Sequence, residues 1–508
     1  MNIDFKNDNE IGVLKIYGTE ENRISSITYD SRKVIDGSAF ACIAGENEDG
    51  HLYIKNAIEQ GATVLLGNNE EVLKRTSENY PDCTFLYVSH VRIAVANLSL
   101  LFHDFRYKDL YTIGITGTNG KTTVAAYVKS LLNNLGLPAG SIGTTGVWSS
   151  KGKLDFQPST PTTPESSDIH EIFDQLYAAG DKAVAMEVSS IAIEQKRVEG
   201  ILFDVGVHTN LSPEHIEYHK NFANYKKAKL KLFEQVKTAV VNADDPAMAA
   251  DILETCEGDI LTYSLLSESQ ADVKATNIMV NDNGSLIDLE VMGETHRVQT
   301  PVFGAYNVAN LLAAVCVAID AGYTAGKIVQ ALSHIENPEG RFELIQEGTA
   351  GRKIILDYAH TPVALRSLLS EVHKLSYKRL IVMIAGIGIR DFNKMPKMAN
   401  AVDGKADSVV VTVDHPGYND PRDIVDKVYG GFSNRFDENI HPTLTREDGV
   451  KKALSLGDEG DIIVLTSGCI NGAQIVKGEK IPHSDEVIIH EYFNDLQSVT
   501  GHALQEDL

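Results

Sequence analysis

The chain has 508 residues, of which 43% are hydrophobic and 23% charged, so about two to four globular domains are expected. Its 46 basic and 70 acidic residues give a formal charge of −24, which disfavours nucleic acid and anionic membranes as partners. The five cysteines have no paired spacing, the first residues are polar and acidic, and no apolar run approaches the roughly 18 residues of a membrane helix. We therefore expect a cytoplasmic protein with free thiols and no membrane insertion.

The first block of sequence mixes short strands with helical pieces. Strands are predicted at Phe40–Ala44 and Ala62–Leu66, and a helix at Tyr53–Gln60 between them. The polar stretch His103–Leu110 predicts a linker. Taken by itself, the Asp-Ser-Arg sequence at residues 30–32 predicts only a turn.

A second block begins with the β-branched strand Tyr111–Thr116, a glycine-rich turn at Gly117–Gly120 and a helix from Thr122 to about Leu135. Helical segments separate further predicted strands, which indicates a parallel α/β sheet. These strands lie at Ala183–Val188, Phe203–His208 and Ala239–Asn242.

The turn after the first of these strands carries the strongest chemical signal. It reads Gly117-Thr118-Asn119-Gly120-Lys121-Thr122-Thr123. Backbone N–H groups of such a turn can cradle phosphate oxygens, with Lys121 on the β and γ phosphates and the Thr122 hydroxyl on Mg²⁺. A tight turn made with glycines is the plainer alternative. The generic phosphate loop would place its first glycine at Ile115, so a shortened, family-specific loop is implied.

Two further polar segments follow predicted strand ends. Glu187 ends a strand near the phosphate loop, where a carboxylate can hold Mg²⁺, although a solvated loop acid is the plainer interpretation. The segment His208–His219 contains three histidines and two glutamates, which suits metal or phosphate contacts or a polar surface loop. Beyond it, Lys226, Lys227 and Lys231 are expected on the surface of a basic helix.

A third block, from about Arg341, predicts a second doubly wound unit, because strands alternate with helical segments. The predicted strands are Lys353–Leu356, Leu380–Ala385, Ser408–Val413 and Asp461–Leu465.

Taken in order, the motifs resemble the Mur ligases over essentially the whole chain, and within them the UDP-N-acetylmuramoyl-tripeptide synthetases (MurE-type). The resemblance is carried by YDSRKVIDGSAFACIAGENEDGH, GITGTNGKTTV, TPTTPES, MEVSSIAIEQKRV, HTNLSPEHIEYHKNFANYKKAKLKLF, GAYNVANLLAAV, GRFELI and LDYAHTPVAL. It implies an α/β fold of three domains: an N-terminal UDP-sugar-binding domain (1–107), a central P-loop ATPase domain with a parallel sheet (108–338) and a C-terminal Rossmann-like amino-acid-binding domain (339–508).

The resemblance also implies site residues. Those for the UDP-linked substrate are Ser31, Thr162, Thr163, Ser189, Gln195 and Arg197. Those for ATP are residues 117–123 together with Asn310, Arg341 and Asp357. Lys121, Glu187, His215 and Lys229 are implied as catalytic, and Thr122, Glu187, His215 and a carbamylated Lys229 as Mg²⁺ ligands. A carbamate turns a cation into the oxygen ligand that Mg²⁺ prefers.

The implied reaction has two steps. The substrate carboxylate attacks the γ-phosphate of ATP to give an acyl phosphate, and the amine of a free amino acid then displaces phosphate. The expected partners are thus a UDP-N-acetylmuramoyl dipeptide and an amino acid, with ATP and Mg²⁺ as cofactors and a monomeric enzyme. The C-terminal domain is expected to close over the centre, because water would hydrolyse the acyl phosphate.

The chain departs from the family pattern in its third block. Arg390, Asp391 and Lys394 match a family motif, and Arg390 and Asp414 are expected to bind the amino acid. Gly417 stands where diaminopimelate enzymes carry an arginine that pairs with the distal carboxylate. Residues 468–472 read Gly-Cys-Ile-Asn-Gly in place of Gly-Lys-Gly-His-Glu. L-Lysine is therefore favoured over meso-diaminopimelate, with Asp414, Asp485 or Glu486 as the partner of its ammonium group.

Other functions stay open at this point. A neutral or unusual amino acid, a paralogue acting on another carboxylate acceptor, and a folylpolyglutamate synthase-like ligase are alternatives within the superfamily. A non-catalytic nucleotide-sugar-binding protein is suggested by the altered residues 468–472, and a P-loop kinase or motor by the phosphate loop alone. The Asp-Ser-Arg block argues against the folate enzymes, which are expected to lack that domain.

Overall fold

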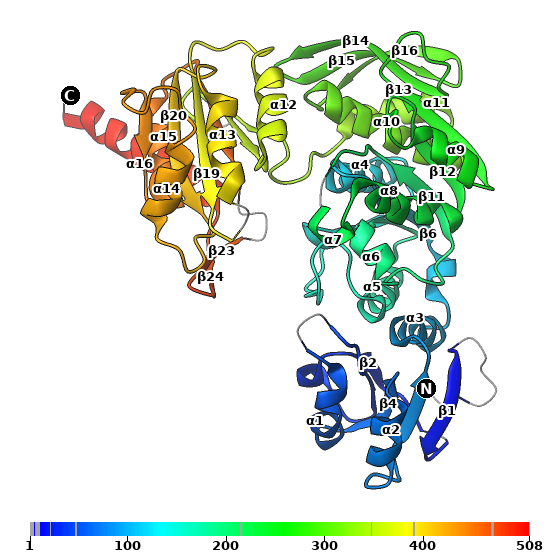
Figure 1. Ribbon diagram of the computed structural model, residues 1–508. Helices are drawn as coiled ribbons and strands as arrows, with labels where there is room; N and C mark the ends of the chain where they lie inside the picture. The colour runs from blue at the N-terminus through cyan, green and yellow to red at the C-terminus, as the bar shows by residue number, and fades with distance from the viewer. Residues whose placement is uncertain are drawn as a thin grey trace. The chain divides into compact units, whose positions relative to one another are not determined.

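The computed structural model describes residues 5, 11–20, 22–45, 48–213, 216–346, 348–389, 392–468 and 472–506. The chain divides into two units, one of residues 1–275, 290–295 and 309–331 and the other of residues 276–289, 296–308 and 332–508 (Figure 1). Three consecutive blocks of sequence each contain a sheet with helices beside it, as the α/β prediction required. The predicted domain boundaries after residues 107 and 338 stay predictions.

The N-terminal block is a five-stranded sheet in the order β1-β5-β4-β3-β2. Strands β2 to β5 are parallel, and β1 pairs antiparallel with β5. The strands are β1 (Val13–Gly18), β2 (Ser26–Thr28), β3 (Ser38–Ala41), β4 (Ala62–Gly67) and β5 (Thr84–Val88), and the helices are α1 (Ile54–Glu59), α2 (Glu70–Ser77) and α3 (Val91–Phe102). Apolar clusters fill both faces of the sheet. The strand predicted at Phe40–Ala44 therefore begins and ends earlier than expected.

Helix α2 shows how local chemistry fixes an element. The Asn69 side chain caps it by accepting from the Val72 N–H. Glu70 and Glu71 lie in its first turn and Lys74 and Arg75 in its last. These charges are opposite in sign to the partial charges of the helix ends, so the cap and the charged side chains both stabilise the helix.

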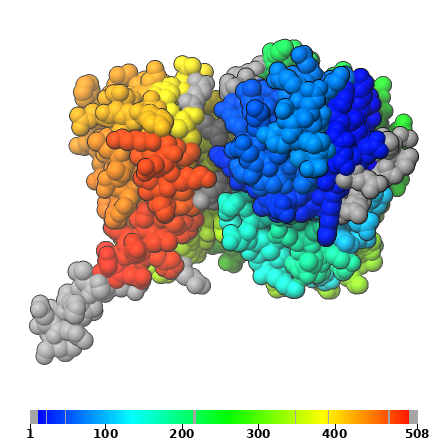
Figure 2. All heavy atoms as spheres, turned by 90° about the horizontal axis from the view of Figure 1, so that it is seen from below, coloured from blue at the N-terminus to red at the C-terminus, as the bar shows by residue number. Residues whose placement is uncertain are grey.

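The segment predicted as a linker is packed instead. It contains a short 3₁₀ helix, η3 (Arg106–Asp109), whose Tyr107 is buried. His103 Nδ1 and Arg106 Nε lie 2.5 and 3.1 Å from the carboxylate oxygens of Asp174 in α5 (Ser166–Ala179). The polar residues thus form ion pairs with the central block, which composition alone does not reveal. In Figure 2 the N-terminal block (blue) adjoins the early part of the central block (cyan).

One part of the central sheet has the strand order β13-β12-β11-β6-β10-β7-β8-β9. Neighbouring strands in the stretch β13-β12-β11-β6-β10-β7 are all parallel. They are β6 (Tyr111–Thr116), β7 (Ala139–Gly143), β8 (Gly146–Ser149), β9 (Gly152–Lys153), β10 (Ala183–Glu187), β11 (Phe203–His208), β12 (Val236–Asn242) and β13 (Asp259–Ser264). The helices are α4 (Lys121–Asn134), α5, α6 (Ser190–Glu194), α7 (Ile216–His219), α8 (Phe222–Leu230) and α9 (Ala249–Thr255). Strand β6 is at the centre and almost wholly buried, which explains its β-branched sequence.

A hairpin continues the sheet beyond β7. Strands β7, β8 and β9 are antiparallel, and the turn between β7 and β8 holds Thr144 and Thr145. Trp148 in β8 donates its indole N–H to the Thr145 carbonyl oxygen at 3.2 Å. The ammonium groups of Lys129 and Lys153 lie 5.6 and 5.3 Å from its ring. These contacts fix the indole close to the turn.

The strands β14 (Val273–Asn281), β15 (Gly284–Val291) and β16 (Glu294–Thr300) follow β13, and the helices α10 (Ala305–Asp320) and α11 (Ala325–Ala331) come next. The division between the two units falls within this segment, so each unit takes part of it. In the part of the chain that the structure describes, no helix combines the length and apolar character needed to cross a membrane.

The second unit contains a sheet in the order β17-β18-β22-β19-β20-β21. Its strands are β17 (Glu343–Ile345), β18 (Lys353–Asp357), β19 (Leu380–Ile387), β20 (Ser408–Asp414), β21 (Ile440–Pro442) and β22 (Ile462–Thr466), and a hairpin of β23 (Ala473–Val476) and β24 (Glu479–Pro482) follows. The helices are α12 (Pro362–Val372), α13 (Met395–Val402), α14 (Pro421–Tyr429), α15 (Arg446–Leu456) and α16 (Asp485–Glu506). All neighbouring strands from β18 to β21 are parallel, which confirms the predicted second doubly wound unit.

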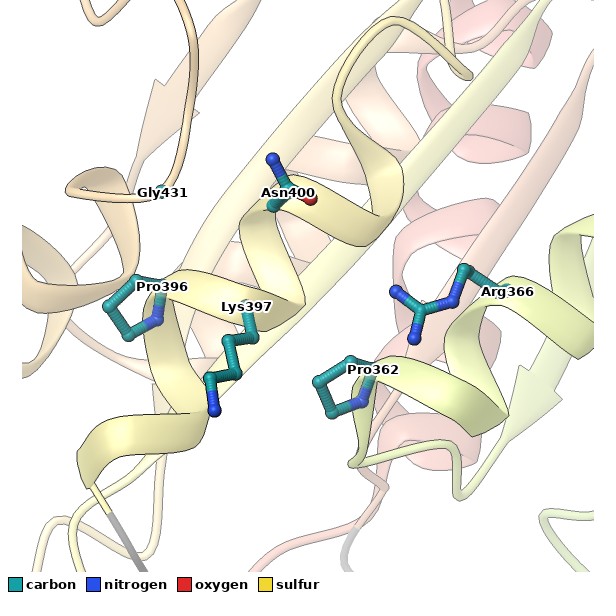
Figure 3. Close-up of a pocket in the computed structure, with 6 residues that line it drawn as sticks. All are labelled: Pro362, Arg366, Pro396, Lys397, Asn400 and Gly431. Atoms are coloured by element: carbon teal, nitrogen blue, oxygen red, sulfur yellow. The ribbon is translucent and has the colours of Figure 1, made fainter.

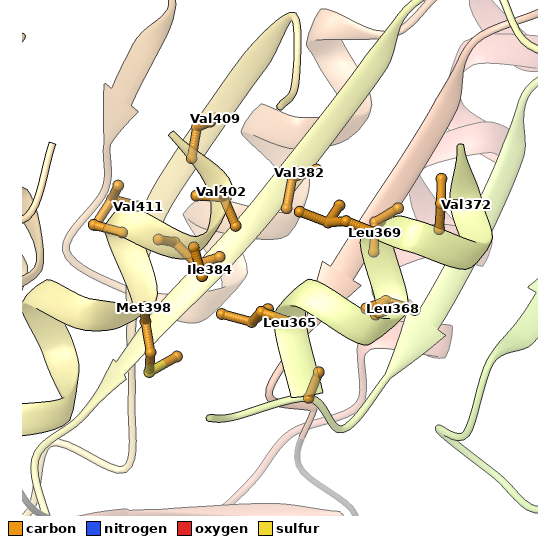
Figure 4. Close-up of a cluster of buried hydrophobic side chains, with 14 of the residues drawn as sticks. Leu365, Leu368, Leu369, Val372, Val382, Ile384, Met398, Val402, Val409 and Val411 are labelled. Atoms are coloured by element: carbon orange, nitrogen blue, oxygen red, sulfur yellow. The ribbon is translucent and has the colours of Figure 1, made fainter. Parts of the chain in front are cut away.

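The core of this unit follows from helical periodicity. Leu365, Leu368, Leu369 and Val372 share one face of α12 and pack against β19 and α13 (Figure 4). Their spacing of three and four residues places them on a single stripe. Each side chain of this kind contributes about 1.5–3 kcal/mol when fully buried. The stripe therefore sets how α12 lies on the sheet.

Candidate functional site

Predicted catalytic residues meet at the carboxyl edge of the central sheet. In the parallel register Glu187 of β10 lies beside Ile115 of β6, and His208 of β11 lies beside Thr116. The phosphate loop leaves β6 at this same edge. Carboxyl ends of parallel strands are where α/β sheets place their ligands.

The glycines of the loop lie where another residue would clash. Gly117 and Gly120 have φ values of +151° and +86°. A Cβ at Gly117 would lie 1.8 Å from Thr209 Oγ1, and one at Gly120 would lie 2.5 Å from Asn310 Oδ1. The loop therefore needs glycine both for its backbone angles and for close approach. Asn310 also lies beside the loop, as predicted.

The loop is tied to the segment that follows β11. Thr118 Oγ1 donates to the Ser212 carbonyl oxygen at 3.1 Å and accepts from the Ser212 N–H at 2.9 Å. The Asn119 N–H donates to Asn210 Oδ1 at 3.0 Å, and Thr209 Oγ1 donates to the Asn119 carbonyl oxygen at 2.6 Å. The Thr118 N–H also donates to the Asn210 carbonyl oxygen at 2.8 Å, so the loop is fixed in one conformation against the segment that follows β11.

Two lysine amines converge on one carbonyl oxygen of the loop. Lys121 Nζ donates to the Gly117 oxygen at 2.8 Å, and Lys229 Nζ donates to the same atom at 2.7 Å. Lys121 also donates to the Thr118 oxygen at 2.9 Å. Lys229 lies on α8 and is 1% exposed, with its ammonium group 4.8 Å from the Tyr225 ring. A residue in helix α8 is thus brought directly to the phosphate loop.

Glu187 is held by the turn after β7. Its Oε1 accepts from the Thr144 N–H at 2.8 Å, and its Oε2 lies 3.3 Å from Thr144 Oγ1. Its exposed fraction is 1%, and a Cβ at Gly143 would lie 2.1 Å from Oε1. The carboxylate is therefore fixed in position, which argues against a solvated loop acid. Thr144 was not predicted and has no sequence signal of its own.

The histidine-rich segment is only partly described. His215 lies outside the described residues. His219 is buried, with Nε2 2.9 Å from Ser190 Oγ. His208 Nε2 lies 2.6 Å from Asp245 Oδ2, and burial lowers the pKa of His208 while Asp245 opposes that change. These two histidines thus have internal partners, which favours a structural role for them.

The residues present fit a magnesium ion in their chemistry. Thr122 supplies a hydroxyl at the start of α4, Glu187 supplies a carboxylate, and a carbamate on Lys229 would supply further oxygens. No group of three or more histidine, cysteine, aspartate or glutamate side chains suited to a metal occurs among the residues described.

Five of the residues predicted for the UDP-linked substrate lie on or next to a loop at residues 159–165, namely Thr162, Thr163, Ser189, Gln195 and Arg197. Thr163 Oγ1 donates to the Glu187 carbonyl oxygen at 3.0 Å and lies 3.2 Å from Ser189 Oγ. Arg197 Nη1 donates to the Thr163 carbonyl oxygen at 2.8 Å, and its Nη2 donates to Gln195 Oε1 at 2.6 Å. Thr162 has a φ of +66°, which is uncommon for a β-branched residue. Strain of this kind gathers at functional loops.

Ser31 begins the 3₁₀ helix η1 (Ser31–Lys33) in the N-terminal block. Asp30 caps this turn by accepting from the Arg32 N–H at 3.0 Å and pairs with the Arg32 guanidinium at 2.8 Å. The turn predicted from Asp-Ser-Arg is therefore present, and the Ser31 hydroxyl is partly exposed.

In the second unit, Arg341 lies near Asp357, and the role predicted for both in ATP binding stays a prediction. Asp357 ends β18 and accepts from the N–H groups of Phe342 and Ala359 at 2.9 and 2.8 Å. Burial raises the pKa of Asp357, and Arg341 opposes that change. The Arg341 guanidinium lies 4.9 Å from the Tyr358 ring. A carboxylate and an aromatic ring side by side suit a ribose and a base.

Asp414, which the sequence predicts to bind the amino acid, has partners within the second unit, and its role stays a prediction. It is 1% exposed, accepts from Gln474 Nε2 at 3.0 Å, and has its Oδ2 4.0 Å from Arg446 Nη1. Asp485 is engaged by Arg446 Nη2 at 2.6 Å, and Glu486 accepts from Ser484 Oγ at 2.6 Å. A lysine ammonium would have to displace these internal partners. Arg390 and Asp391 lie outside the described residues, and Lys394 lies at the N-terminal end of α13.

Gly417 is confined by its surroundings. Its φ is +62°, and a Cβ there would lie 2.8 Å from Ile389 Cγ2. Its N–H donates to the Ile475 carbonyl oxygen at 3.0 Å, which ties the loop to the hairpin of β23 and β24. Replacement of Gly417 by arginine would strain the backbone, so the conformation of this loop favours glycine at this position.

The second unit also has a surface hollow of about 380 Å³ between α12 and α13 (Figure 3). Its lining is Pro362, Arg366, Pro396, Lys397, Asn400 and Gly431. The sequence did not single out any of these residues. Because Arg366, Lys397 and Asn400 are exposed, the hollow has none of the buried polar groups of the central edge.

Comparison with known proteins gives three family matches in chain order. Residues 23–103 match a model described as the Mur ligase family, catalytic domain. Residues 115–318 match the Mur ligase middle domain, and residues 340–469 match the Mur ligase glutamate ligase domain. Together these matches span all three sheets.

Curated relatives match nearly end to end. A UDP-N-acetylmuramoyl-L-alanyl-D-glutamate--2,6-diaminopimelate ligase from Clostridium perfringens is 35% identical over 94% of this chain and 96% of its own length. A ligase of the same name from Bacillus licheniformis is 33% identical over 92% of this chain and 94% of its own length. A solved structure of such a ligase has a TM-score of 0.68 at 26% identity, covering 98% of this chain and all of that one. Folylpolyglutamate synthase from Mycobacterium tuberculosis shares only the fold, at 16% identity, a TM-score of 0.60 and 74% coverage of this chain and 92% of that one.

Proposed function

The chain belongs to the Mur ligase family, and we propose that it is the ATP-dependent ligase that adds the third amino acid to UDP-N-acetylmuramoyl-L-alanyl-D-glutamate. The observation that carries this proposal is that Lys121 and Lys229 meet at the Gly117 carbonyl oxygen of the phosphate loop, while Glu187 ends the strand next to β6 at the same sheet edge. A ligase that forms an acyl phosphate needs this combination of a phosphate cradle, a cation and oxygen ligands for Mg²⁺.

The residues divide the reaction between them. The loop N–H groups and Lys121 would hold the phosphates of ATP while the substrate carboxylate attacks the γ-phosphorus and ADP leaves. Glu187, Thr122 and carbamylated Lys229, with His215, would hold Mg²⁺, which offsets the phosphate charge. The amine of the amino acid would then attack the acyl carbon, so that phosphate leaves and the amide forms. Arg341, Asp357 and Asn310 would hold the nucleoside of ATP.

Carbamylation of Lys229 is part of this proposal. Its amine would lose a proton and add to CO₂, giving a carbamate with two oxygen ligands. Burial at 1% exposure beside a second amine favours an uncharged or anionic group at this position over another cation. The bond from Nζ to the Gly117 oxygen shows that the group already reaches the loop.

The amino acid is the finer part of the proposal. The relatives are named for 2,6-diaminopimelate, which supports that diamino acid. Gly417, whose φ of +62° and contact with Ile389 exclude an arginine, supports L-lysine, because a distal carboxylate would have no arginine there. We retain L-lysine as the proposal from this chain's own residues and meso-diaminopimelate as the alternative.

Two rivals fit the structure less well. A folylpolyglutamate synthase-like enzyme has less support, since that synthase covers 74% of the chain at 16% identity, whereas the Clostridium perfringens ligase covers 94% at 35% identity. A non-catalytic binding protein would not need Lys121 and Glu187 held in place within the sheet edge. The monomeric state and the cytoplasmic location stay predictions, which sedimentation and fractionation would test.

The deciding experiment measures phosphate release by purified protein with ATP, Mg²⁺ and UDP-N-acetylmuramoyl-L-alanyl-D-glutamate. The amino acids offered are L-lysine, meso-diaminopimelate, L-ornithine and small neutral ones. Release that needs both the nucleotide substrate and one amino acid supports the ligase and identifies its third residue. Absence of release with every amino acid would refute the proposed substrate pair.

A further inference from the structure

Glu165 lies between two arginines from different blocks of the first unit. Its Oε2 is 2.8 Å from Arg92 Nη1, and its Oε1 is 3.0 Å from Arg197 Nε. The Glu165 side chain is 8% exposed and that of Arg197 is 10% exposed. Arg92 lies on α3, which follows the N-terminal sheet, whereas Glu165 ends the 159–165 loop and occupies the N-cap position of α5 without a side-chain capping bond. One carboxylate thus joins the two blocks.

Arg197 is largely committed to the protein itself. Nη1 donates to Thr160 Oγ1 at 3.0 Å and to the Thr163 carbonyl oxygen at 2.8 Å, and Nη2 donates to Gln195 Oε1. A guanidinium has five N–H donors, and Arg197 makes three hydrogen bonds inside the protein, two of them to the 159–165 loop. Arg197 therefore shapes the loop that carries Thr163, in addition to any contact it makes with substrate.

A second contact joins the same loop to the N-terminal block. Tyr29 of the N-terminal block lies near the Ser159 side chain, and burial raises the pKa of Tyr29 to about 12, so the phenol stays protonated. Ser159 also donates its N–H to Asp168 Oδ2 at 2.8 Å. Tyr29 stands two residues before Ser31, which the family resemblance assigns to the uridine end. Both ends of the loop are thus fixed from the N-terminal side.

We propose that Glu165 and Arg92 are positioning residues for Arg197, and that they hold the 159–165 loop in the shape that binds the muramoyl dipeptide. The inference rests on the proposed function for the identity of the substrate. The pairing itself rests on the two ion pairs of Glu165. A buried carboxylate that loses one arginine keeps an unbalanced charge, so the two contacts act as one unit.

The test combines Glu165→Gln, Arg92→Gln and the double variant, with Glu199→Gln as the matched control. Glu199 pairs with Lys196 on the same side of the central block, with both side chains 33% exposed, so its loss is expected to have no effect. We expect Glu165→Gln to raise the KM for the UDP-linked dipeptide by roughly tenfold or more, with the KM for ATP unchanged. Arg92→Gln should have a smaller effect, Arg92→Lys should restore most of the binding, and the double variant should equal Glu165→Gln.

Other outcomes would overturn the proposal. Equal losses toward ATP and the dipeptide would indicate general damage to the fold. Strict additivity of Arg92→Gln and Glu165→Gln would show that the two contacts are independent. An unchanged KM in Glu165→Gln would remove the positioning role altogether.

A measurement without substrate separates this proposal from the proposed function. Hydrogen exchange of the peptide covering residues 159–165 should be faster in Glu165→Gln and Arg92→Gln than in the wild type and in Glu199→Gln. If the wild type turns over no UDP-linked dipeptide but the exchange differs in this way, the function fails and the loop inference stands. Unchanged exchange in both variants refutes the loop inference whatever the activity.

Discussion

The carboxyl edges of the two parallel sheets use their charged residues differently. At the edge of β6 and β10, Lys121 and Lys229 both point their amines at a loop carbonyl oxygen, and Glu187 accepts from a backbone N–H. After β20 and β22 the carboxylates Asp414 and Asp485 face the buried guanidinium of Arg446. A charged side chain at a sheet edge is therefore not always available to a ligand. Whether it can bind one depends on the partners that it already has inside the protein.

The largest effect is expected from Lys121→Ala. Loss of the cation that donates to the carbonyl oxygens of both Gly117 and Thr118 should lower kcat/KM by roughly 10³-fold, because the phosphates of ATP would lose that charge. Phosphate release measures this. Lys129→Ala, about two turns further along the same helix, should retain activity. Near-normal turnover in Lys121→Ala would contradict the role of Lys121 in holding the phosphates of ATP.

Lys229→Ala should also abolish turnover, but its defect is expected to be chemically reversible. Added short carboxylates such as formate or acetate should restore part of the activity if a carbamate oxygen is what is missing. Lys227→Ala on the same helix, whose side chain is exposed, is the control and should behave as the wild type. Absence of rescue at any carboxylate concentration would argue for a role of the amine itself.

At the second edge the expected loss is of stability. Asp485→Asn should lower the free energy of unfolding by about 3 kcal/mol, because Arg446 is fully buried and would lose its charged partner. Denaturant titration measures this, and Glu447→Gln, in an exposed pair with Lys451, should change it by about 0.5 kcal/mol or less. A catalytic defect without loss of stability would show that Asp485 serves the substrate instead.

The same pair predicts an acid dependence. Burial raises the pKa of Asp485, but Arg446 and His483 outweigh it and hold that pKa at about 2, below the ordinary 3.8. The unfolded chain then binds the proton first, so the stabilisation is complete above about pH 4 and is lost as the pH falls toward 2. Asp485→Asn should remove this part of the acid dependence.

The smallest effect is expected from Gly417→Ala. Its φ of +62° strains any side chain, and the new Cβ would meet Ile389 at 2.8 Å, so a loss of about 1–2 kcal/mol is expected. Gly404 has a similar φ of +67° with nothing within 4 Å, so Gly404→Ala measures the backbone strain alone. An equal cost at both positions would show that the contact with Ile389 relaxes freely.

The sequence predicted those parts of the fold in which local pattern and tertiary position agree. Strand β6 was predicted at its observed ends, because its β-branched run is buried on both faces and followed at once by a glycine turn. Short strands such as β2 and the pair β23 and β24 were not predicted, since they depend on pairing more than on composition. The boundary between the two units, which falls within the segment from β14 to α10, also has no local sequence signal.

The site was predictable to the extent that motifs name single residues. Lys121, Glu187 and Lys229 were named from motifs, and their convergence is what the structure adds. Partners distant in sequence could not be found in the same way, because Arg92 and Glu165 are 73 residues apart and Arg446 and Asp485 are 39 apart. Such pairs depend on tertiary packing, which one sequence does not display.

The indole of Trp148 gives the molecule an optical reporter of its own. It is the one tryptophan among 508 residues, so the intrinsic emission excited at the red edge of protein absorption comes from a single place. Its N–H is bonded to Thr145, next to the Thr144 that holds Glu187. Any ion or ligand that binds the Glu187 carboxylate is therefore separated from the indole by two hydrogen bonds. Titrations of the unlabelled protein can in this way follow changes at the Glu187 carboxylate.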